Sequence, residues 1–320
     1  MSPGQREIIF YIWPNCTKSM KQVVLAFLLV TSCAVNAQWL WDVGGTLGAS
    51  NYLGDIGGKE GSRKDFISDI KLAKTRWNVG AFGRYKWRPK LSLKASFDYL
   101  RVEGDDKLSA NPGRHFRNFN FKNDIYDLAF TGEYFFFEDN DLGNTYRYRN
   151  GFRAYIFAGV GAFFHNPKTF YQNEWVALQP LATEGYQYKK LVMNIPMGIG
   201  FYFTFNKKNR FGFEMNYRKT FTDYIDDISG NYPADPGDDY MRGLILRKDE
   251  LDPKTIIDNP GAYLSHDWGY KRGDNTNKDA YLTVSLSYSR VIRGKASFYR
   301  VRNTGFFSKK RKMRKIRAKF

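Results

Sequence analysis

Alternation of apolar and polar residues in eight segments constrains the fold of this chain more than any other feature of its sequence. In the last segment, Leu282, Val284 and Leu286 alternate with Thr283 and Ser285. Successive side chains of a β-strand point to opposite faces, so such a strand presents one apolar face and one polar face. The segments span residues 39–50, 77–87, 91–99, 124–136, 154–164, 195–205, 211–221 and 280–289. Each has about 10 residues, enough for a tilted strand to cross a bilayer.

The connections between these segments alternate in length. Long connections cover residues 51–73, 103–116, 166–188 and 225–277, and short ones cover 88–90, 138–151 and 206–209. Outer-membrane barrels have an even number of strands, short periplasmic turns and long outer loops. We therefore predict an all-β fold, an eight-stranded antiparallel transmembrane β-barrel of the outer membrane over residues 38–293. Both chain ends would be periplasmic, and the long loops would be extracellular.

The composition agrees with a membrane barrel. Aromatic residues make up 18% of the chain, yet the mean hydropathy is −0.54. A transmembrane barrel combines these values because only alternate residues face lipid. No run after Ala37 approaches the ~20 apolar residues of a membrane helix. A soluble β-sandwich is the alternative, but it would not place Leu, Val, Phe and Trp on the exposed face of every strand.

Residues 20–37 have the three parts of a secretory signal peptide. A Lys follows the second Met of the chain, an apolar run comes next, and the segment ends in small residues at Ala37. We therefore expect residues 1–19 to precede the true start. The alternatives are a lipoprotein signal that ends at Cys33 and a buried helix of the mature domain. Cleavage after Ala37 would remove Cys16 and Cys33, and the mature chain would then have no thiol.

Charged residues interrupt the polar faces of the predicted strands. An eight-stranded barrel is only wide enough for side chains to fill, and an unpaired charge in a narrow, dry lumen would be costly. The candidates for lumen ion pairs are Asp42, Arg84, Lys86, Lys94, Asp98, Asp127, Glu133, Glu214 and Arg218. We predict that these side chains pair and fill a rigid barrel, in preference to a conducting pore.

The formal charge of +18 is unevenly distributed. Residues 294–320 contain eleven Lys or Arg and no acid, whereas residues 225–277 contain eleven acids and six Lys or Arg. Export argues against nucleic acid as the partner of the basic tail. The tail would contact anionic lipid, peptidoglycan or an acidic protein, unless it is simply solvated. The candidates for partner binding are Lys309, Lys310, Arg311, Lys312, Arg314, Lys315 and Arg317.

No catalytic, cofactor or metal site is predicted. The histidines His115, His165 and His266 lie in separate loops without the spacing of a zinc site. The pair His266-Asp267 resembles the dyad of outer-membrane proteases, but no serine shares a His-x-Ser arrangement with a histidine. The acidic stretch from Asp223 to Asp227 lacks the alternating ligand pattern of a calcium loop, so a solvated turn is expected there. We do not expect an enzyme.

Two stretches carry a resemblance to a known family. The first is Ser50–Ile56, which reads SNYLGDI, and the second covers Pro196–Gly200 and Glu214–Ser229. They resemble the PorG-like outer-membrane barrels of the type IX secretion system in Bacteroidota, over most of residues 38–293. The positions that carry the resemblance are Asn51, Gly54, Asp55, Arg218, Thr220, Thr222, Asp223, Tyr224, Asp226 and Asp227. The tail from Gly294 to Phe320 departs from the common barrel ending.

The resemblance implies a non-catalytic role without a cofactor. PorG-like barrels associate with a periplasmic ring of a lipoprotein and its partner (PorK and PorN), and they anchor or position that ring at the outer membrane. The expected partners are therefore outer-membrane lipid and ring proteins of this kind. The alternative is a surface barrel whose loops bind an extracellular ligand or polymer.

Overall fold

The computed structural model describes residues 41–56, 72–109, 111–139, 151–206, 208–258 and 260–292. Contacts within the chain divide it into two units, one of which is Trp41–Val291. The expected signal peptide at 20–37, residues 1–19 before it and the basic tail at 294–320 lie outside the described residues, as do Cys16 and Cys33.

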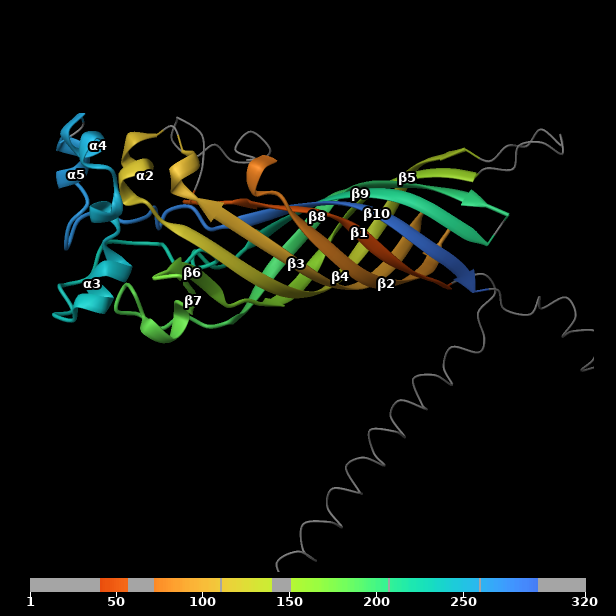
Figure 1. Cartoon of the computed structure of the whole chain (residues 1–320). Helices are drawn as coiled ribbons and strands as arrows, with labels where there is room; N and C mark the ends of the chain where they lie inside the picture. The colour runs from red at the N-terminus through yellow and green to blue at the C-terminus, as the bar shows by residue number, and fades with distance from the viewer. Residues whose placement is uncertain are drawn as a thin grey trace, which may run out of the picture. The chain divides into compact units, whose positions relative to one another are not determined.

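Eight antiparallel strands close into a barrel, which confirms the predicted fold class (Figure 1). They are β1 (Trp41–Leu53), β2 (Arg76–Arg88), β3 (Leu91–Asp105), β4 (Asn120–Asp139), β5 (Gly151–Phe164), β8 (Leu191–Phe205), β9 (Asn209–Thr220) and β10 (Ala280–Ile292). Each strand pairs with the next barrel strand along the chain, and β1 pairs with β10 to complete the ring. The long and short connections alternate as predicted.

The strands extend beyond the segments that alternation marks. β4 has 20 residues, although its alternating segment covers only 124–136. Its additional residues pair with β3 through registers such as Glu103 with Lys122 and Val102 with Asn123. The backbone ladder continues there although the outward positions Asn120 and Lys122 are polar. Alternation therefore locates the part of a strand that faces lipid, and hydrogen bonding determines where the strand ends.

The two faces of the barrel wall differ in the way that alternation predicts. Leu47 points outward and is 65% exposed, whereas the inward Asp127 and Arg218 are 0% and 1% exposed. Trp77 and Trp87, near the two ends of β2, are also exposed. This arrangement reverses that of a soluble protein, because large apolar side chains cover the outside and charges fill the inside. The exterior suits hydrocarbon with aromatic residues at its borders.

The long connections contain regular structure of their own. Helices α2 (Pro112–Arg117), α3 (Asp239–Ile245), α4 (Pro253–Asp258) and α5 (Pro260–Leu264) and the hairpin of β6 (Pro167–Tyr171) and β7 (Glu174–Ala177) gather at one end of the barrel (Figure 1). The short 3-10 helices are η4 (Leu72–Lys74), η5 (Asp106–Leu108), η6 (Gln179–Leu181) and η7 (Lys248–Glu250). Among the described residues, no helix is long and apolar enough to span a membrane.

A hydrophobic core joins these loops to the mouth of the barrel. Its buried members come from β1, β3, β4, β5 and β10, from the connections 106–119 and 221–279, and from Ile56 just after β1. They are Tyr52, Ile56, Leu100, Val102, Phe119, Phe121, Ile125, Phe163, Ile225, Ile228, Tyr232, Ile245 and Tyr281. We call this end of the barrel, with the loops packed on it, the cap. Burial of so many aromatic and aliphatic side chains makes the cap an ordered part of the fold.

Two glycines on the inner face of β1 allow β10 to approach closely. A Cβ atom on Gly48 would lie 2.0 Å from the carbonyl oxygen of Val284, and one on Gly44 would lie 2.2 Å from that of Tyr288. Both contacts are with backbone, which cannot move aside without separating the two strands. A side chain at either position therefore conflicts with closure of the ring.

Gly48→Ala should lower the temperature at which the purified barrel loses its heat-modifiable gel mobility. The added methyl group would separate β1 from β10, whose pairing closes the barrel. Gly83→Ala is the matched control, because a Cβ atom at Gly83 would meet no atom within 4 Å. Equal unfolding temperatures for the two variants would contradict this account of closure.

Candidate functional site

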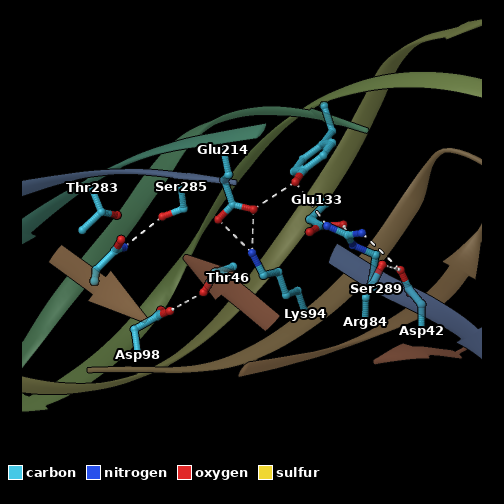
Figure 2. A network of polar contacts seen from close by, with 12 residues as sticks. Asp42, Thr46, Arg84, Lys94, Asp98, Glu133, Glu214, Thr283, Ser285 and Ser289 are labelled. Carbon is cyan, nitrogen blue, oxygen red and sulfur yellow. Dashed lines mark hydrogen bonds and ion pairs between the residues drawn. The ribbon is translucent and has the colours of Figure 1, made fainter. Parts of the chain in front are cut away.

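Arg84 is the centre of the first group of ion pairs in the lumen. Its Nη1 lies 3.2 Å from Asp42 and its Nε lies 2.6 Å from Glu133, so that β2 is connected to β1 and β4. The Arg84 guanidinium also donates to the hydroxyl of Tyr155 at 3.2 Å. Asp42 receives a second cation, Arg210, at 2.7 Å. Figure 2 shows Asp42, Arg84 and Glu133 side by side.

Lys94 and Glu214 form the second group. The Lys94 Nζ donates to both carboxylate oxygens of Glu214, at 2.8 and 2.6 Å (Figure 2). The hydroxyl of Tyr155 donates to the same carboxylate at 2.9 Å, and so connects this pair with Arg84. Both charged side chains are more than nine-tenths buried.

Arg218 holds the third group. It lies 2.7 Å from Asp98 and 2.5 Å from Asp127, two acids that face each other across the β3–β4 ladder. Thr46 also donates to Asp98, and Asn194 donates to Asp127. One guanidinium between two carboxylates offsets most of their mutual repulsion.

Two of these groups cross the full width of the lumen. Lys94 and Asp98 are on β3, while their partners Glu214 and Arg218 are on β9. Three strands separate β3 from β9 in either direction around the ring, so they are opposite walls. Paired side chains therefore bridge the diameter of the barrel at two heights.

The sequence identified most of this network. The structure brings together eight of the nine candidates in buried ion pairs, as given above. Lys86 is the exception: it is half-buried, and it makes no ion pair with any described residue. Arg210, which sequence reasoning missed, is a second partner of Asp42. Its even number in the β9 alternation could have identified it as inward-facing.

The residues of the family-like stretches meet in the cap around one tyrosine. The Tyr52 hydroxyl lies 2.6 Å from an oxygen of Asp226 and 2.8 Å from an oxygen of Asp279, and it accepts the N–H of Asp55 at 3.1 Å. The other oxygens of these two acids accept N–H groups of Ile225 and Ile228. All of these polar atoms belong to buried residues.

The hydrogen bonds around Tyr52 require an additional proton. A phenol has one proton to donate, so it satisfies only one of the two facing carboxylates. The other carboxyl must itself be protonated and donate to the Tyr52 oxygen. Burial accordingly raises the pKa of Asp226 and of Asp279 well above the usual range, and the nearby Asp55 adds to both shifts. We therefore assign a shared proton to this pair.

Asp227 forms a second anchor of the cap. Its carboxylate accepts hydrogen bonds from Tyr188, at 2.7 Å, and from Thr183. Arg272 donates to its carbonyl oxygen at 2.9 Å and forms an ion pair with Glu184 at 3.0 Å. Burial raises the pKa of Asp227 to about 6, with Arg272 opposing the shift. Its backbone has a φ of 70°, a left-handed conformation that Asp adopts more readily than most residues.

The remaining motif positions have structural roles nearby. Asn51 donates to Thr75 at 3.0 Å, and Thr220 donates to the carbonyl of Asp279 at 2.7 Å. A Cβ atom on Gly54 would lie 1.8 Å from the Tyr52 hydroxyl, so no other residue fits there. The Thr222 hydroxyl accepts the N–H of Tyr224.

The expectation of a solvated acidic turn is wrong. Asp223, Asp226 and Asp227 are each at most 2% exposed, because the loops of the cap close over them. Groups of three or more acids, histidines or cysteines that could hold a metal ion are absent from the described part of the chain. In the sequence pair His266-Asp267, the His266 Nδ1 lies 3.2 Å from the neighbouring Ser265 hydroxyl, while Asp267 faces Lys248 at 3.6 Å.

Comparison with known families places this chain. The family described as "Domain of unknown function (DUF6089)" matches residues 20–248. The chain belongs to this family. No curated protein matches it.

Solved structures with a similar fold are bacterial barrels. Neisserial surface protein A is 8% identical, covers 80% of this chain and 98% of its own, and has a TM-score of 0.34. The attachment invasion locus protein Ail of Yersinia pestis, in complex with the heparin analogue sucrose octasulfate, is 8% identical, covers 78% and 98%, and scores 0.31. The outer membrane protein OprG of Pseudomonas aeruginosa is 8% identical, covers 78% and 92%, and scores 0.30. Likenesses this distant support no statement about function.

Glu214→Leu should destabilise this DUF6089 barrel by about 3–5 kcal/mol, because it leaves the buried Lys94 without its counter-charge. The heat-modifiability midpoint measures the loss. Lys94→Met together with Glu214→Leu should recover much of it, since no buried charge is then unpaired. A double variant no more stable than Glu214→Leu would show that these two side chains are not coupled.

The cap of this DUF6089 member should loosen as the pH rises. A carboxyl whose folded pKa is raised stabilises the fold at low pH, and this contribution is lost as the pH rises through the folded pKa. For Asp227 this loss of stability occurs between about pH 4, the usual pKa of Asp, and about pH 6, its pKa in the folded protein. For Asp226 and Asp279 the loss begins at the same pH and extends higher, because burial raises their pKa well above the usual value. The charged groups that face Asp226 are Asp279, Asp55, Asp223 and Arg117.

Limited proteolysis of the long loops between pH 5 and 9 measures this loosening. Cleavage of the native protein should accelerate with pH, and Asp226→Asn should flatten the profile because an amide keeps a donor without an ionisable proton. Asp235→Asn, at an exposed position of the same loop, is the control and should behave as the native chain does. Loops that become more resistant at high pH would contradict the shared proton.

Proposed function

We propose that this protein is a non-conducting, non-catalytic barrel of the outer membrane that anchors or positions a periplasmic ring of the type IX secretion machinery. The observation that carries the proposal is the bridged lumen. Lys94–Glu214 and Arg218–Asp98 connect opposite walls, and buried Tyr155, Phe157 and Tyr202 pack beside them. A lumen filled in this way does not form a channel, so the functional surfaces are the two ends of the barrel and its outer wall.

Placement in the outer membrane has support from the wall of the barrel. Large apolar side chains cover the outside of all eight strands, and examples are Leu93 at 50%, Val160 at 57% and Phe211 at 52% exposure. Closed barrels of this kind satisfy every backbone group internally, which is the condition for crossing a bilayer with strands. The expected signal peptide at 20–37 accords with export to that membrane.

The ring-anchoring role has support from the resemblance and from the charge distribution. The family-like residues from Asn51 to Asp55 and from Thr220 to Asp227 build the cap, and Arg218 bridges the lumen, so the resemblance lies in residues on which the fold depends. β10 ends at Ile292, at the end of the barrel with short turns and opposite the cap, and the basic residues 294–320 follow it in the sequence. That end faces the periplasm in barrels of this class.

A surface barrel that binds an extracellular ligand is the second candidate. A pocket of 440 Å³ opens in the cap between α2 and residues 265–274. Its polar lining includes Arg114, Ser265, Lys271 and Asp274, and Tyr270 supplies an aromatic face. A pocket of this size suits a small polar molecule.

Affinity purification from solubilised outer membranes distinguishes the two functions. The full chain should retain ring subunits, and a chain truncated after Gly294 should lose them while its barrel remains heat-modifiable. High salt should mimic the truncation, because contacts between exposed charges are screened. Purification of the full chain without any ring protein would refute the ring-anchoring role. If the truncated chain still retained ring subunits in high salt, the contact would instead lie on the turns 88–90, 138–151 and 206–209.

A further inference from the structure

Three lysines without acidic partners lie along one side of the barrel, at the end that carries the cap. Lys189 and Lys190 directly precede β8, and Lys219 is next to last in β9. None of them forms an ion pair with any residue that the structure describes. The nearest acids in sequence, Glu184 and Asp223, are buried within the cap. We call these three lysines the lysine edge.

The lysine edge lies beside an exposed apolar face. Leu191 and Met193 of β8 are 65% and 59% exposed, and Phe221, just after β9, is 60% exposed. The Phe221 N–H donates to the carbonyl of Met193, so the two strands are adjacent at this height. The cations therefore occur where the hydrocarbon-facing surface ends. This is the height at which lipid headgroups carry their phosphates.

The side chain of Lys219 extends toward the cap. Its backbone is level with Ile195 of β8, farther from the cap than Phe221 and Met193. A Lys219 side chain pointing straight outward would therefore place its charge beside hydrocarbon. The Nζ donates to the carbonyl oxygen of Lys278 at 3.1 Å, and Lys278 lies in the loop that precedes β10. Lysines at membrane borders direct their ammonium groups to the headgroup layer in this way.

The opposite side of the barrel, around β2, β3 and β4, differs in the residues that the structure describes. Three of its cations at the same end are paired with acids: Lys74 with Asp105 at 3.1 Å, Arg76 with Glu103 at 2.6 Å and Arg101 with Asp124 at 2.6 Å. Lys122 of β4 instead lies over the ring of Trp175, at 3.8 Å from its centroid. Among the described residues, three cations are thus neutralised by acids on that side, whereas none of the three lysines of the lysine edge is.

We propose that Lys189, Lys190 and Lys219 bind the phosphate groups of an anionic lipid in the leaflet at the cap end of the barrel. Acyl chains of this lipid would cover Leu191, Met193 and Phe221, while its phosphates receive the ammonium groups. The proposal rests on membrane placement, as proposed above, and is independent of the ring-anchoring role.

The test uses the purified full chain in detergent and bisphosphorylated lipid A as the probe, with binding measured by native mass spectrometry. Lys189→Gln combined with Lys219→Gln should weaken binding roughly five-fold per lysine, or about 25-fold together, since each cation near an anionic surface contributes on the order of 1 kcal/mol. Lys74→Gln with Arg101→Gln is the control: it removes the same charge from the paired side and should change binding little.

Three results would overturn the proposal. Equal weakening in the two double variants would show a general charge effect. Unchanged binding in Lys189→Gln/Lys219→Gln would show that the lysine edge does not bind the lipid. Binding of inorganic phosphate as tight as that of lipid A would show that acyl chains contribute nothing, so that the ligand is not a lipid. Loss of binding on removal of the phosphates from lipid A supports the assignment. Heat-modifiable mobility verifies folding of every variant, and a failed purification of ring proteins would leave these measurements unaffected.

Discussion

Opposite charges across a narrow lumen are the constraint on which the rest of this structure depends. An ion in a dry interior is tolerated only with a well-placed counter-charge. Lys94 on β3 and Arg218 on β9 each pair with an acid on the opposite wall, across the full diameter of the lumen. This requirement restricts strand order and register together. A slip of one residue in β3 would turn Lys94 toward lipid and bring Leu93 into the lumen. The ion pairs therefore specify the arrangement of the barrel as much as they stabilise it.

Buried polar groups with defined partners also hold the cap together, beyond the membrane-facing part of the wall. Tyr52 of β1 binds Asp226 and Asp279, two acids whose pKa is raised by burial and by neighbouring carboxylates. Arg272 binds Glu184 and the backbone of Asp227 and so joins two of the long loops. Because these contacts are buried and directional, the described segments 165–190 and 221–279 form one ordered body with the mouth of the barrel. A pocket or a lipid-binding edge built on such a body has a defined shape before any ligand arrives, which lowers the entropic cost of binding.

Sequence reasoning predicted the barrel well because its signal is local. Alternation such as that of Leu282 and Thr283 can be read within ten residues, and inward charges follow from the same parity. Arg210 was missed only because it precedes the marked segment of β9. The acids of the cap were misjudged for a deeper reason. Asp226 looks like part of a solvated turn until Tyr52, 174 residues away in sequence, is placed against it.

The sequence by itself determined the class of fold, the number of strands and the sides on which apolar and charged residues lie, since each depends on the two-residue period of a strand. Only the tertiary structure decided which charges meet. Lys94 could have paired with several acids of the inner face, and its distance to Glu214 on the opposite wall follows from closure of the ring. The proton shared by Asp226 and Asp279 and the unpaired state of Lys189 and Lys219 likewise depend on chain segments that become neighbours only when the barrel closes and its loops fold over the mouth.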